Sequence, residues 1–180
     1  PDSLLGSAWP VMHKAFQVPL SYAGLVTMII SGGTICSSLM SERLTKKFGT
    51  QIVTVFSVML TAIALFGFST ASAFWMLCLW AIPYGLGAGA IDAALNNYVA
   101  LHYNSRHMSW LHCFWGLGTI ISPYVMSYAL TTSVWQNGYR MVSFIQIGIA
   151  LILFVTLPIW KVNKKETAQE EKAEEDMVGI

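Results

Sequence analysis

Residues 48–91 read FGTQIVTVFSVMLTAIALFGFSTASAFWMLCLWAIPYGLGAGAI and include no Asp, Glu, Lys or Arg. These 44 residues are about twice the ~20 that a helix needs to cross the hydrocarbon core of a bilayer. The polar cluster at residues 69–72 is typical of a turn between two such helices. This stretch therefore predicts two adjacent membrane-spanning helices, at about residues 51–68 and 73–101.

The rest of the chain repeats this pattern of long apolar spans separated by short polar segments. We expect further spans at about residues 20–40, 109–130 and 141–160. Residues 1–13 are too few to cross a bilayer, so we expect them to be part of a truncated first helix. Pro10 and Pro19 would lie on either side of the turn that follows it. The predicted fold class is an all-α membrane protein, with residues 1–160 forming one helix bundle.

The composition indicates the same class and excludes others. Hydrophobic residues make up 55% of the chain and charged residues 11%, with a mean hydropathy of +0.57. A soluble domain has about 25% charged residues. Six of the nine acids lie in residues 161–180, which we expect to be a charged linker toward an absent second half. The remaining charged residues are too few to form a water-soluble surface. They also form no basic stripe, which disfavours nucleic-acid binding.

Catalysis and metal binding are disfavoured as well. The sequence has no nucleophile with a base at helical spacing, no pair of metal ligands and no phosphate-binding loop after a strand. The sequence has three cysteines, an odd number, and their spacing shows no pairs. This pattern argues against both a disulfide framework and a metal site. We therefore expect no enzyme, no metal and no cofactor.

The distribution of basic residues predicts the orientation in the membrane. Alternating spans would place eight of the ten on one side, namely Arg43, Lys46, Lys47, Arg106, Lys161, Lys164, Lys165 and Lys172. Only Lys14 and Arg140 would lie on the other side. Because basic residues are enriched in cytoplasmic loops, we expect a multi-pass protein of the cell membrane. The start of the chain and the 161–180 linker would both be cytoplasmic.

Asp92 is the most costly side chain within the predicted spans. An acid at the centre of a membrane helix costs about 2.5–3.5 kcal/mol on insertion scales. Asn96 lies one turn later on the same helical face, and Asn97 follows it. We expect Asp92 to be functional and to face the bundle interior or a water-filled cavity. For Gly85 and Gly89 we expect helix packing instead.

The next predicted span carries a polar and aromatic stripe that includes His112 and Trp115. Two interpretations of His112 are open, a functional ligand or a side chain hydrogen-bonded to a neighbouring helix. Trp110 and Trp115 either stack on a sugar ring or simply fill space. A second acid, Asp2, lies within the truncated first helix.

The segment SLMSERLTKK at residues 38–47 resembles Gly-x-x-x-Asp-Arg-x-Gly-Arg-Lys, the signature between the second and third helices of the major facilitator superfamily. Glu42 takes the place of the Asp and Arg43 that of the Arg, while both glycines are replaced. The resemblance implies a fold of twelve helices in two halves, of which this chain is the six-helix amino-terminal half. Glu42, Arg43, Lys46 and Lys47 would form a cytoplasmic gating loop, or would only set the topology.

Within that superfamily, the chain is most similar to the fucose–galactose–glucose:proton symporter group. Its fourth helix has a Gly-rich run followed by Glu-Thr-Ala-Ala-Asn-Pro, and residues 85–97 here read GLGAGAIDAALNN. Asp92 matches the family's carboxylate and Asn96 its Asn, whereas Asn97 replaces the Pro. The resemblance also implies that Asp2 represents an acid of the first helix.

The fifth helix extends this resemblance. Residues 112–118, HCFWGLG, resemble Gln-Thr-Phe-Asn-Ser-Phe-Gly of the same group. His112 takes the position of the Gln, and Trp115 takes that of the Asn.

The resemblance implies proton-coupled uptake of a sugar or related small polar solute by alternating access in a bilayer. Because desolvation favours the protonated form of a carboxylate, Asp92 would carry the proton, together with Asp2. The substrate contacts would come from Asn96, Asn97, His112, Trp115 and Trp110. Two alternatives remain open, a proton-driven exporter of small apolar compounds on the same fold and a non-transporting membrane scaffold.

Overall fold

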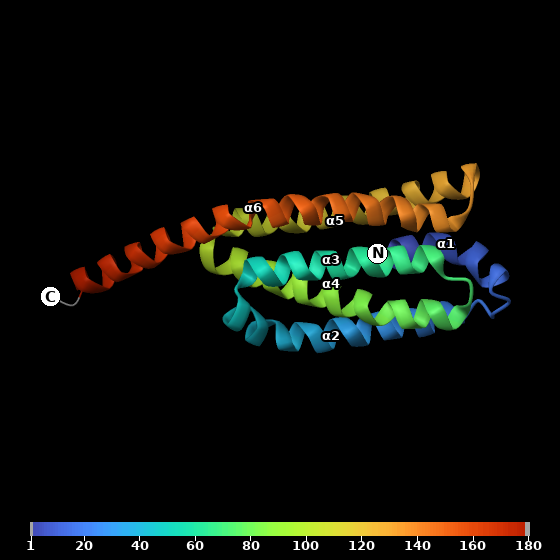
Figure 1. The fold of residues 1–180 in the computed structure, drawn as a ribbon, viewed down its shortest axis with the longest axis horizontal. Coiled ribbons are helices and arrows are strands. Elements are labelled where there is room, and N and C mark those ends of the chain that lie inside the picture. Colours follow the sequence, from blue (N-terminus) through green and yellow to red (C-terminus); the bar gives the residue numbers. More distant parts are fainter. Residues whose placement is uncertain (1, 179–180) are drawn as a thin grey trace.

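The computed structural model describes the backbone of residues 2–178 and the side chains of residues 3–157. Six helices make up the described backbone, and they form one elongated bundle (Figure 1). Their bounds are α1 (Asp2–Ala15), α2 (Tyr22–Phe48), α3 (Thr50–Thr70), α4 (Phe74–His102), α5 (Ser105–Thr132) and α6 (Trp135–Val178). The fold is all-α, as predicted.

Five of these helices are long and apolar enough to cross a membrane. They are α2, α3, α4, α5 and the part of α6 from Trp135 to Leu157. Helix α1 has 14 residues and is too short for this. Helices satisfy all of their backbone hydrogen bonds internally, which is why hydropathy alone locates such spans well.

The expected loop at residues 42–47 is helical, so that prediction was wrong. Helix α2 continues to Phe48, and Lys46 Nζ donates to Glu42 Oε1 at 2.6 Å, a spacing of four residues that supports a helix. The helix ends at Gly49, whose φ of 86° is a left-handed conformation that glycine adopts without strain. Its N–H donates to the Thr45 carbonyl oxygen at 2.8 Å. The helix therefore ends at the glycine and not at the first charged residue.

Other helix boundaries also differ from the expected ones. Helix α1 continues through Pro10 to Ala15, so the turn after it is formed by residues 16–21. Helices α5 and α6 begin before residues 109 and 141, which places Arg106 and Arg140 in helical turns and not in loops. A polar turn at a helix end is compatible with the headgroup region beyond the hydrocarbon core. Apolar content therefore underestimates the length of a helix.

Helix α4 lies between α2 and α3, and α3 packs in turn against α6 (Figure 1). Glycines allow this close approach. A Cβ on Gly85 would overlap the carbonyl oxygen of Ile30 in α2, and one on Gly89 would overlap that of Thr34. On the α3 side, a Cβ on Gly87 would lie 2.7 Å from Thr61 Cγ2. The packing interpretation of Gly85 and Gly89 is therefore confirmed.

Polar side chains join α6 to α3. Ser143 is fully buried and its hydroxyl donates to the Ala62 carbonyl oxygen at 2.9 Å. Gln146 Nε2 donates to Thr61 Oγ1 at 2.6 Å. Since Thr61 also contacts α4, these bonds attach α6 to the central pair of helices.

Replacing Gln146 with Leu is expected to lower the stability of the bundle by about 1 kcal/mol, which lies within the range for one interhelical hydrogen bond in a membrane protein. Thermal unfolding in detergent would measure the change. The matched control is Thr156→Val in the same helix, because Thr156 Oγ1 bonds only to carbonyl oxygens of α6, at 3.0 and 3.1 Å. Equal melting temperatures for the two variants would contradict the expected role of Gln146.

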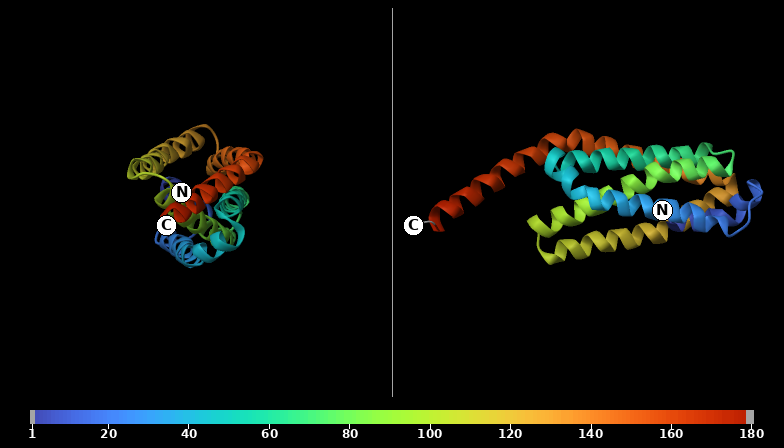
Figure 2. Two further views of the ribbon diagram at one scale, coloured as in Figure 1. Left: turned by 90° about the vertical axis from the view of Figure 1, so that its left-hand side faces the viewer. Right: turned by 90° about the horizontal axis from the view of Figure 1, so that it is seen from below.

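The main apolar core lies at the end of the bundle that holds α1. Its centre includes Phe68, whose ring centroid lies 5.9 Å from that of Tyr84 and 5.5 Å from that of Tyr139. The turn that joins α4 and α5 lies at the other end, and the two helices diverge from it toward the middle of the bundle (Figure 2). Asp92 and the first half of α5 belong to this more open end.

Candidate functional site

Asp92 and Asn96 form a hydrogen-bonded pair on an exposed face of α4. The Asn96 side-chain amide donates to Asp92 Oδ1 at 3.2 Å and to the Asp92 carbonyl oxygen at 2.9 Å. Asn96 Oδ1 is buried and accepts no hydrogen bond from the described residues. Asp92 and Asn96 therefore share a helical face, as predicted, and the pair keeps one free acceptor on Asn96.

The exposure of Asp92 differs from one of our expectations. Within the described residues its side chain is exposed and does not face the interior of the six-helix bundle. The physical reason is that α1 lies at the other end of the bundle, while α5 diverges from α4 (Figures 1 and 2). The other expected location, a water-filled cavity, stays a prediction.

The predicted ligands of α5 are exposed as well. Trp110 and Trp115 are 56% and 66% exposed, and His112 is also exposed. The Trp110 ring lies near that of Phe114, with 6.1 Å between centroids. In the part of the chain with described side chains, no hydrogen bond joins His112 to Asp92 or Asn96. The fold thus places the predicted site residues of α4 and those of α5 on neighbouring helices, but it does not join them by hydrogen bonds.

The two remaining predicted site residues are Asn97 and Asp2. Asn97 is exposed, and its side chain makes no hydrogen bond with the described residues. Asp2 begins α1, but its side chain lies outside the described residues. Asn97 is therefore a matched comparison for Asn96, since the two amides are adjacent and only one of them is paired.

The charged end of α2 holds one ion pair, between Lys46 and Glu42, and both side chains are more than two-thirds exposed. Lys47 Nζ lies 5.2 Å from the centroid of the Phe48 ring, and Arg43 is exposed beside them. The Lys46–Glu42 pair lies within one helix, and no ion pair joins two helices among the described side chains. A gate that latches across helices stays a prediction.

Comparison with known proteins identifies the family. The family model described as "Major Facilitator Superfamily" matches residues 2–179, nearly the whole chain. The chain belongs to the major facilitator superfamily. Its six helices correspond to half of a major facilitator fold.

The chain is also similar to two curated proteins. "Bypass of stop codon protein 6" of Saccharomyces cerevisiae is 23% identical over 156 residues, which cover 85% of this chain and 31% of that protein. The "Glucose/mannose transporter GlcP" of Bacillus subtilis is 22% identical over 168 residues, 91% of this chain and 40% of that protein. The chain therefore spans less than half the length of either relative.

Three hydroxyl side chains of α2 make contacts that the sequence analysis did not predict. Thr34, Ser38 and Ser41 of α2 donate to main-chain carbonyl oxygens of α4, at 3.3, 3.2 and 3.3 Å. The spacing of four and then three residues places them on one helical face. That spacing is visible in the sequence. The acceptors are backbone atoms, however, so the residue types of α4 do not show which positions accept these bonds.

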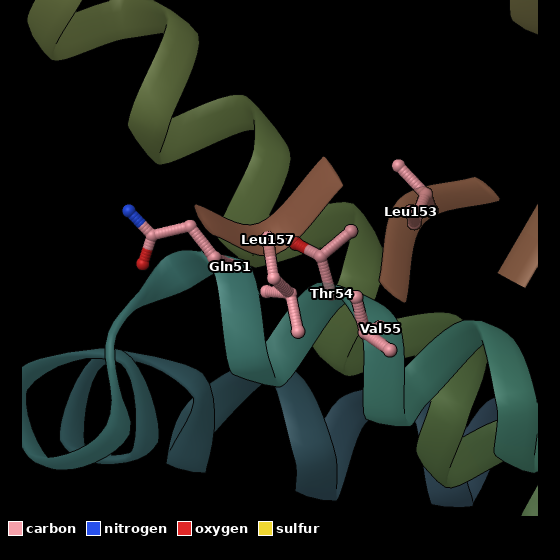
Figure 3. Close-up of a pocket in the computed structure, with 5 residues that line it drawn as sticks. All are labelled: Gln51, Thr54, Val55, Leu153 and Leu157. Atoms are coloured by element: carbon pink, nitrogen blue, oxygen red, sulfur yellow. The ribbon is translucent and has the colours of Figure 1, made fainter. Parts of the chain in front are cut away.

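A small surface pocket lies between α3 and α6 (Figure 3). Its lining is formed by Gln51, Thr54, Val55, Leu153 and Leu157. None of the predicted site residues belongs to it. The candidate site of this chain is therefore the Asp92–Asn96 pair with the exposed faces of α4 and α5.

Proposed function

We propose that the protein containing this chain is a secondary transporter that moves protons together with a sugar or related small polar solute. The observation that carries the proposal is the Asp92–Asn96 pair, an acid and an amide within an apolar span. Membership of a superfamily with a relative named as a glucose/mannose transporter supports the same class of solute. We also propose a second six-helix half that completes the fold.

The chemistry of the pair suits proton binding. Ionised Asp92 accepts a hydrogen bond from the Asn96 amide, as it does at 3.2 Å. Protonated Asp92 would instead donate, and an amide can accept through its oxygen after a rotation of its side chain. Asn96 can thus pair with both protonation states. Protonation also removes the charge that makes an acid costly inside a membrane.

These properties define a transport cycle by alternating access. Asp92 binds a proton from outside, the neutral loaded carrier rocks to face inward, and the proton leaves to the cytoplasm. The solute would bind between the halves, against the exposed faces of α4 and α5. Its hydroxyl groups would contact Asn96, Asn97 and His112, with Trp115 or Trp110 against the ring. Asp2 would be a second proton-binding acid.

Uptake by proteoliposomes tests this function directly. The full-length protein would be reconstituted and offered a panel of hexoses and deoxyhexoses, with and without an inward proton gradient. We expect gradient-dependent accumulation of at least one sugar. A gradient that leaves the uptake of every sugar unchanged would contradict the proposal. Efflux of apolar dyes under the same gradient would then favour an exporter.

The orientation can be tested by labelling. In a variant without Cys36, Cys78 and Cys113, we expect Lys47→Cys to react with an impermeant thiol reagent only from the cytoplasmic side. The matched position is Lys14→Cys, because Lys14 is also exposed and lies toward the opposite end of the bundle. It should react only from outside. Reversed labelling of the two positions would overturn the proposed topology.

A further inference from the structure

The segment of α4 that leads to Asp92 has little tendency to be helical by itself. Pro83 lacks a backbone N–H and so removes one hydrogen bond of the helix. Gly85, Gly87 and Gly89 follow within six residues, and glycine favours a helix less than any residue except proline. A contact from a neighbouring helix would therefore help to keep this segment in one conformation.

Helix α2 supplies that contact. Thr34 Oγ1 shares its one hydrogen between the carbonyl oxygens of Ile30 in α2, at 3.0 Å, and Gly85 in α4, at 3.3 Å. Ser38 Oγ donates to the Gly89 carbonyl oxygen at 3.2 Å. Ser41 is 3% exposed, and its Oγ donates to the Ala90 carbonyl oxygen at 3.3 Å. We name these three side chains the hydroxyl clamp. The clamp spans the Gly-rich segment and ends two residues before Asp92.

The glycines make these bonds possible. A Cβ on Gly85 would overlap the Ile30 carbonyl oxygen, and one on Gly89 would overlap the Ser37 and Thr34 oxygens. Because no side chain separates the two helices there, short hydroxyl groups can reach the carbonyl oxygens of α4. The same glycines thus lower the helical tendency of the segment and let the hydroxyl clamp reach its carbonyl oxygens.

We propose that Thr34, Ser38 and Ser41 are positioning residues for the Asp92–Asn96 pair. By binding the carbonyl oxygens that precede Asp92, they fix the rotation of α4 about its axis and hence the direction in which the carboxylate points. Ser41 also directly precedes Glu42, so the clamp connects the charged end of α2 to the helical turn of Asp92. This role rests on the proposed function, in which Asp92 carries the proton.

The clamp can be tested without any transport measurement. In the full-length protein, the double variant Ser38→Ala/Ser41→Ala should raise hydrogen exchange of the amides of residues 85–94 by about tenfold, the effect of two weak interhelical hydrogen bonds. Ser38→Thr keeps a hydroxyl donor and should leave exchange unchanged. The control is Thr27→Ala in the same helix, because Thr27 bonds only to the Ala23 carbonyl oxygen, at 3.1 Å. Unchanged exchange in the double variant would overturn the clamp.

The positioning role has a separate readout. In proteoliposomes, the double variant should shift the pH of half-maximal uptake, while Ser38→Thr should retain the pH profile of the wild type. Faster exchange with an unchanged pH profile would overturn positioning and leave a purely structural contact. If Asp92→Asn accumulates solute like the wild type, the proposed function fails, whatever the exchange experiment shows about the clamp.

Discussion

Replacing Asp92 with Asn is expected to abolish accumulation against a gradient, so that the solute ratio across the membrane falls to one. Asn has nearly the same shape and can still form a hydrogen bond with Asn96, which pairs with Asp92 in this structure. It cannot bind and release a proton, however. Exchange of solute across the membrane is expected to continue, because the variant resembles the protonated carrier. Proteoliposomes preloaded with unlabelled solute would measure both activities.

The adjacent amides provide the control for this result. Asn96 is bonded to Asp92, whereas Asn97 is exposed and makes no side-chain hydrogen bond with the described residues. Asn96→Ala should therefore change the pH dependence of uptake, while Asn97→Ala should change at most the affinity for solute. Accumulation by Asp92→Asn at the wild-type level would remove Asp92 from the proton pathway.

The second large effect concerns the packing of α2 against α4. Gly89→Leu is expected to destabilise the bundle by about 3 kcal/mol or more, at or above the upper end of the range for overpacking. The reason is that a Cβ at this position would already overlap the Thr34 carbonyl oxygen, a backbone atom that cannot move aside. Thermal unfolding and the yield of monodisperse protein in detergent would show the loss.

Gly32→Leu is the matched control in α2. A Cβ on Gly32 would meet no atom within 4 Å. Leucine also favours a helix over glycine by about 0.8 kcal/mol. This variant is therefore expected to be neutral or slightly stabilised, so that the two substitutions differ in sign. A similar loss of stability in both would show that helix packing at Gly89 is not the cause.

The spans, the class of fold and the shared helical face of Asp92 and Asn96 were predictable from the sequence. Hydropathy locates the spans because backbone polar groups in lipid must be satisfied within a helix. The helix period then places residues 92 and 96 on one face. The helix ends were less predictable. Helix α2 passes through the charged residues 42–47 because charge ends a hydrophobic span without ending a helix.

Some features required the tertiary structure. No residue pattern states that α4 and α5 diverge, so the exposure of Asp92 and the separation of His112 from Asn96 could not be predicted. The sequence shows hydroxyl groups at helical spacing in α2, but not that they reach the backbone of α4. It was likewise silent on the bond between Gln146 and Thr61, which are 85 residues apart.

The sequence by itself thus determined that this is a membrane helix bundle, where its spans lie and that Asp92 and Asn96 share a face. These properties depend on local hydropathy and on the period of one helix. The tertiary structure alone decided which face of α4 contacts α2, and which face remains open for Asp92. These two faces of α4 depend on how closely its glycines let α2 approach and on hydrogen bonds to main-chain carbonyl oxygens. Every residue has such an oxygen, so no sequence pattern shows which of them will accept a bond.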